Sequence, residues 1–91
     1  MSSLCVRFLE RSLFPTMARM VSPGGCVLIY QFKVGAEAFG HPKDPRLLVR
    51  DQELASVFSE EIGFRTLVDR TEYLPDGRPM VAFLAQKIKV S

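Results

Sequence analysis

Three side chains about a third of the way along the chain have a placement that is typical of ligand contacts. Tyr30, Gln31 and Phe32 end an almost continuously apolar run that begins at Cys26. Ligands of open α/β sheets gather at the carboxyl ends of strands, so a ligand is expected to lie near these three residues. The alternative is that Tyr30 and Phe32 are core residues and that Gln31 is a solvated strand end.

No residue pattern predicts a catalytic group. His41 is the only histidine, and a general base needs both a partner and a positioned substrate. Glu60 and Glu61 are adjacent on a predicted helix and face different directions, so they do not form an acid/base pair. Arg7 and Arg11 are four residues apart and could contact an anion, or they are simple surface charges.

The apolar run is the clearest predicted element. Residues 26–32 are bounded by the turn sequence Ser22-Pro23-Gly24-Gly25, and the run is too short for a helix. This pattern is typical of a strand that is buried on both faces. Apolar residues at helical spacing predict a helix before it, over residues 13–21, with Ser12 as its cap.

Three further elements follow a long loop, which we expect over residues 34–49. Residues 51–62 have the apolar spacing of a helix, and Gly63 stands where a C-terminal cap belongs. Residues 64–73 predict a strand near a sheet edge, and residues 74–78 predict a turn. The apolar stretch within residues 79–90 predicts an interior strand.

These elements predict an α/β fold in one small domain over residues 1–91. A short turn joins the last two strands, so they pair antiparallel. Two strands are expected to be doubly buried and the middle one is not. The final strand therefore lies between the other two, in a mixed three-stranded sheet with two main helices.

The whole pattern resembles the C-terminal half of class I S-adenosylmethionine-dependent methyltransferases, particularly tellurite-resistance-like members. Family members have a helix, a Pro-Gly-Gly turn, an apolar strand, a long loop, a helix and a closing antiparallel hairpin. The matching segments are Leu13-Phe14-Pro15, Ser22-Pro23-Gly24-Gly25, residues 26–32, Phe39-Gly40-His41-Pro42, Glu53-Leu54 and residues 78–85. The resemblance implies a partial Rossmann-like fold, with Phe39 and His41 forming a wall beside the substrate; the alternative is that Phe39 anchors the loop.

The cofactor half of that family has no counterpart in this sequence. Its glycine-rich turn after the first strand and the acidic residue that follows are both absent, and Gly24-Gly25 precedes a strand instead of following one. The segment 6–11 resembles the stretch after the family's fourth strand, so the resemblance implies that Arg7 contacts the cofactor. We expect no strand upstream of this segment. We also expect no cofactor on this chain alone, and S-adenosylmethionine in the full-length family.

Composition narrows the possible partners. The net charge is +2 without a basic stripe, and no run approaches 20 apolar residues, so we expect no nucleic acid, no membrane and a cytoplasmic location. Two cysteines and one histidine are too few for structural zinc. We expect either a missing N-terminal half as partner or a homodimer, because residues 26–32 would present an exposed apolar edge. A small ligand-binding protein that uses the loop 34–49 is a third possibility.

Overall fold

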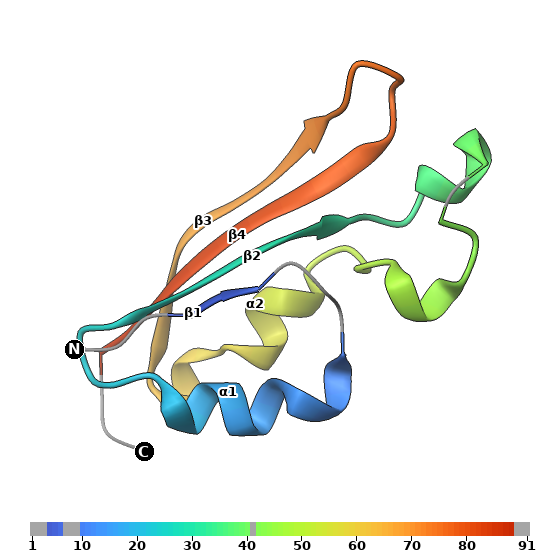
Figure 1. The fold of residues 1–91 in the computed structure, drawn as a ribbon. Helices are drawn as coiled ribbons and strands as arrows, with labels where there is room; N and C mark the ends of the chain where they lie inside the picture. The colour runs from blue at the N-terminus through green and yellow to red at the C-terminus, as the bar shows by residue number, and fades with distance from the viewer. Residues whose placement is uncertain (1–3, 7–9, 41, 89–91) are drawn as a thin grey trace.

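The structure is a computed structural model, and it describes residues 4–6, 10–40 and 42–88 (Figure 1). The strands are β1 (Leu4–Val6), β2 (Cys26–Phe32), β3 (Phe64–Tyr73) and β4 (Pro79–Lys87). The α-helices are α1 (Phe14–Met20) and α2 (Glu53–Val57). Short 3-10 turns are η1 (Arg11–Leu13), η2 (Ala36–Phe39), η3 (Pro45–Leu47) and η4 (Glu60–Ile62).

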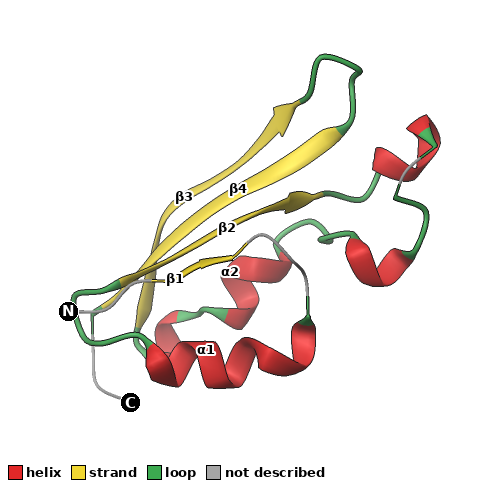
Figure 2. Ribbon diagram, in the orientation of Figure 1, coloured by secondary structure: helices red, strands yellow, loops and turns green. Residues whose placement is uncertain are grey.

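The four strands form one sheet in the order β1-β2-β4-β3 (Figure 2). The last strand lies antiparallel between β2 and β3, which confirms the predicted central position of the final strand. The predicted mixed sheet of three strands is wrong, because these three strands pair antiparallel throughout and the described sheet has a fourth strand. The only parallel pair in the described sheet joins β1 to β2, and it was not predicted.

The expectation of a bare outer edge on β2 is wrong. Leu4 pairs with Val27 at the start of this edge. At its far end the Phe32 carbonyl accepts a hydrogen bond from the Val49 amide at 2.9 Å. The expectation that no strand precedes residue 6 is also wrong, since β1 lies there, and the free edge on this side belongs to β1.

The first helix forms where it was predicted, but its cap differs. Glu10, not Ser12, caps the turn before α1, because its carboxylate accepts hydrogen bonds from the Ser12 amide at 3.4 Å and hydroxyl at 2.9 Å. The helix ends at Met20, before Pro23, as predicted. Lys87 at the end of β4 is buried and donates to the Ala18 carbonyl at 2.9 Å, which ties the sheet to the last turn of α1.

The predicted helix over residues 51–62 is interrupted. Its backbone leaves the helical region at Phe58 (φ −95°, ψ 68°) and is extended at Ser59, which separates α2 from η4. The Phe58 ring then packs into the core, 5.3 Å from the Phe64 ring and 5.7 Å from the Phe14 ring between centroids. Gly63 follows with φ 89°, and the predicted C-terminal cap is confirmed there.

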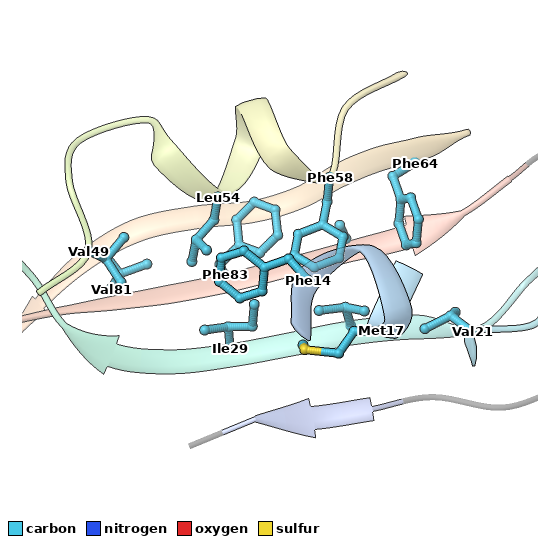
Figure 3. Packing of buried hydrophobic residues seen from close by; sticks show 12 residues of the cluster. Phe14, Met17, Val21, Ile29, Val49, Leu54, Phe58, Phe64, Val81 and Phe83 are labelled. Atoms are coloured by element: carbon cyan, nitrogen blue, oxygen red, sulfur yellow. The ribbon is translucent and has the colours of Figure 1, made fainter. Parts of the chain in front are cut away.

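The core lies on one face of the sheet. Both α-helices cover that face, and rings and aliphatic side chains from α1, α2, β2 and β4 meet between the layers (Figure 3). Val27 and Ile29 of β2 point into this core, whereas Leu28 between them is 41% exposed. The prediction that β2 and β4 are buried on both faces is therefore wrong, because no helix of the described part covers the opposite face, where Leu84 of β4 is half-buried (Figure 2).

Candidate functional site

A pocket of about 390 Å³ lies beside the segment that follows β2. Four of its lining side chains are cationic: Arg11, Lys43, Arg46 and Arg50. Arg11 follows β1 in the chain and the other three follow β2, so the pocket is built from segments beyond the carboxyl ends of two parallel strands. This is the position at which open α/β sheets bind their ligands.

Arg11 holds the loop that forms one wall of the pocket. Its guanidinium pairs with the Glu53 carboxylate through Nε and Nη2, the latter at 2.9 Å from Oε1. Its Nη1 donates to the Arg46 carbonyl at 3.0 Å, and its Nη2 donates to the Leu48 carbonyl at 2.8 Å. One side chain thus connects α2, η1 and the loop 46–48.

Glu53 is the buried half of this ion pair. Its side chain is 8% exposed, and it also accepts a hydrogen bond from the Arg50 amide at 2.9 Å. The hydrogen bonds from Arg11 hold the pKa of Glu53 below its ordinary value, with the Arg50 amide acting in the same direction. The carboxylate is therefore ionised at neutral pH. The ion pair with Arg11, which holds the loop, is then fully formed.

The arginines of the other two charge pairs of the pocket are more exposed than Arg11. Asp44 caps η3 by accepting from the Arg46 amide at 2.9 Å, and the Arg46 Nη2 lies 2.7 Å from its carboxylate. The side-chain hydrogen bonds from Arg46 lower the pKa of Asp44. Arg50 Nε lies 3.7 Å from Glu53 Oε1, which is too long for a hydrogen bond.

The residues predicted at the end of β2 point to opposite faces of the sheet. Tyr30 and Phe32 are half-buried on the helix-free face, and the Arg78 guanidinium lies 4.8 Å from the centre of the Phe32 ring. Gln31 points into the helix-covered face, where its residue is 7% exposed. The alternatives of two core aromatic residues and a solvated glutamine are therefore wrong. None of the three lines the pocket.

Gln31 is nonetheless unusual in its environment. Its Nε2 atom is fully buried and has no hydrogen-bond partner. A buried donor without a partner costs about 1–3 kcal/mol, so native structures contain few of them. This amide is the one polar atom near the predicted site that the described contacts do not explain.

Phe39 anchors the long loop instead of lining the pocket. Its ring packs over the turn of the β3–β4 hairpin, where a Cβ placed on Gly77 would lie 2.9 Å from a ring carbon. The residue is 54% exposed. The alternative of Phe39 as a loop anchor thus agrees with the structure, while His41 and Arg7 lie outside the described residues.

The pocket itself was missed by the sequence predictions, although a signal was present. Lys43, Arg46 and Arg50 bring three cations into eight residues of the long loop. Their convergence with Arg11 depends on the ion pair with Glu53, which joins positions 42 residues apart. In the described ranges no three His, Cys, Asp or Glu side chains are grouped as metal ligands would be. No helix there is long and apolar enough to cross a membrane.

The chain is similar in sequence to a fungal protein. No protein-family model matches the chain. Over 88 residues the chain is 31% identical to an uncharacterized protein of Schizosaccharomyces pombe, and the match covers 94% of this chain. It covers 26% of the yeast protein, so the chain spans about a quarter of the length of this relative.

Proposed function

We propose that this chain is the C-terminal half of a class I S-adenosylmethionine-dependent methyltransferase fold and cannot bind the cofactor or transfer a methyl group by itself. The observation that carries the proposal is the strand order. The resemblance implies a closing hairpin whose last strand returns antiparallel to the centre of the sheet, and β4 lies antiparallel between β2 and β3.

The other edge of the sheet supports the same proposal. β1 and β2 are parallel neighbours, and β1 is the edge strand on that side. Further parallel strands could add to β1 and continue the sheet, as a doubly wound fold requires. The cofactor half that has no counterpart in this sequence would supply these strands.

The helix-free face is a second support. Sheets of doubly wound proteins carry helices on both faces, because each face must bury its apolar side chains. Here Leu28 is 41% exposed, and Tyr30 and Leu84 are half-buried on the face that α1 and α2 leave open. Helices from additional polypeptide would cover these side chains, and the greater length of the yeast relative leaves room for them.

Calorimetric titration of the purified 91-residue chain with S-adenosylmethionine tests the proposal for this chain alone. We expect no saturable heat up to millimolar cofactor and no methyl transfer to any added acceptor. Circular dichroism of the same sample controls for folding, since an unfolded chain would also fail to bind. Saturable binding at micromolar cofactor would contradict the claim that half of the site is missing.

The helix-free face also favours a second candidate function, which is self-association. Two copies could pack these faces together, or could join their β1 edges, and so remove apolar surface from water. Mass determination in solution separates the two candidates. A dimer that Leu28→Lys dissociates, and that Leu13→Lys leaves intact, would favour self-association. Leu13 is the matched control because it is equally exposed, at 41%, and lies in η1 instead of in the sheet.

A clean monomer at high concentration would exclude self-association and leave the methyltransferase half as the remaining proposal.

A further inference from the structure

We infer that the pocket beside the loop 43–50 binds the acidic group, carboxylate or phosphate, of a small molecule, with Lys43 and Arg50 as the anchoring cations. This inference deepens the proposed function and rests on it in one respect: the acid would be the methyl acceptor. Anion binding by the pocket itself depends only on the local charges and geometry.

The charges of the pocket are unequally paired. Arg11 is matched by Glu53 and Arg46 is matched by Asp44. Lys43 forms no hydrogen bond or ion pair within the part of the chain that the structure describes. Arg50 makes only the long 3.7 Å contact to a carboxylate that Arg11 already occupies.

The one acidic side chain in the lining does not oppose these cations directly. The Glu37 Oε2 atom accepts a hydrogen bond from the Gly35 amide at 2.8 Å, so this carboxylate is held at the start of η2. A ligand carboxylate or phosphate would give Lys43 and Arg50 the charged hydrogen-bond acceptor that the protein does not provide. The charge pattern therefore favours an anion over a cation or a neutral ligand.

The loop is already fixed in the shape that forms the pocket. Arg11 holds the carbonyls of Arg46 and Leu48, and the Leu47 amide donates to the Asp44 carbonyl at 2.9 Å. Just beyond, the Val49 amide donates to the Phe32 carbonyl at the end of β2, and the Val49 carbonyl accepts from the Val34 amide that follows the strand, both at 2.9 Å. Binding to a segment that is already ordered loses less conformational entropy, which favours a small ligand with few contacts.

The remaining walls limit the size and polarity of the ligand. Val34, Pro45 and Leu48 line the pocket beside the cations, and Leu48 is buried beneath it. A volume of about 390 Å³ is within the range of small-molecule sites. These features fit a compact acid with an apolar body, such as an aromatic or branched acid, better than an extended polyanion.

The test is an NMR titration of the isotope-labelled 91-residue chain with benzoate, phenyl phosphate and benzamide, without cofactor. The first two probes distinguish a carboxylate from a phosphate on the same apolar body, and benzamide is the neutral control. We expect at least one acid to shift the amides of residues 43–50 and to bind roughly tenfold or more tightly than benzamide. Raising the salt concentration should weaken binding of the acid and leave binding of benzamide unchanged.

The variants Lys43→Gln and Arg50→Gln, alone and combined, identify the anchoring groups. Both residues are exposed, so the folded spectrum should persist. The double variant should lose roughly tenfold or more in acid affinity. Arg65→Gln is the matched control, because Arg65 is an exposed cation on β3 that does not line the pocket, and it should bind as the unaltered chain does.

Failure of both acids to bind, equal binding of benzamide, or an equal loss in Arg65→Gln would overturn the inference. These outcomes do not depend on S-adenosylmethionine. Anion binding together with saturable S-adenosylmethionine binding by this chain would therefore leave the inference standing while the proposed function failed.

Discussion

Glu53 is the residue on which the conformation of the loop 46–48 depends most. It is 8% exposed and receives hydrogen bonds from the Arg11 guanidinium and the Arg50 amide. The glutamine variant keeps the shape of the side chain but removes the charge that Arg11 requires. We expect Glu53→Gln to lower the free energy of unfolding by about 1–3 kcal/mol. Urea unfolding measures this, and Glu60→Gln, at an exposed position in η4, should change it little.

The same ion pair predicts a pH dependence of stability. The hydrogen bonds from Arg11 hold the pKa of Glu53 below its ordinary value, so the folded state gives up this proton more readily than the unfolded state. The stabilisation is therefore complete above about pH 5 and is lost as pH falls through the lowered pKa. The stability difference between the unaltered chain and Glu53→Gln should shrink below about pH 4. A difference that stays constant from pH 7 to pH 3 would contradict this origin.

The buried amide of Gln31 predicts an effect of the opposite sign. Its Nε2 has no partner, so Gln31→Met should raise the free energy of unfolding by about 1–3 kcal/mol. Gln86→Met is the control, because the Gln86 amide donates to the Gly24 carbonyl at 3.0 Å and its loss should destabilise. Thermal unfolding of both variants decides the matter. Destabilisation by Gln31→Met would mean that the amide has a partner in solution.

At the scale of elements, the sequence predicted the strands better than the helices. The boundaries of β2 and β3 and the hairpin turn follow from local signals: apolar runs and turn residues. The break in the helix after Val57 could not be predicted from spacing, because it depends on the contacts of Phe58 with rings from distant segments. Burial of β2 on one face could not be predicted either, since it depends on where both helices pack.

The contact between the hairpin turn and the long loop predicts that a substitution in the turn also affects the loop. Gly77 has φ +96°, and a Cβ there would press on the Phe39 ring at 2.9 Å. Gly77→Ala should therefore lose about 1–2 kcal/mol of stability from backbone strain and also shift the NMR signals of Phe39. Gly40→Ala is the matched control, because Gly40 has φ +109° with open space around its Cβ position. It should lose a similar amount of stability without moving the ring. Unaltered Phe39 signals in Gly77→Ala would contradict the contact.

At the scale of the whole molecule, the sheet has one covered face and one open face. The strand order could be predicted, because the short turn after β3 and the apolar character of β4 leave one arrangement that buries the last strand. The pairing of β1 could not, since three residues carry too little pattern to indicate a strand. The pocket could be predicted only in part, because its three loop cations are close in sequence but meet Arg11 only when Arg11 reaches Glu53 across the fold.

The central claim is that this fold is the C-terminal half of a larger methyltransferase fold. It is tested most directly by calorimetric titration of the full-length Schizosaccharomyces pombe relative with S-adenosylmethionine. The matched segment is about a quarter of that protein, so a variant lacking it is the informative partner. We predict saturable binding by the full-length protein and its loss or severe weakening in the folded deletion variant. Absence of binding by the folded full-length protein would contradict the claim.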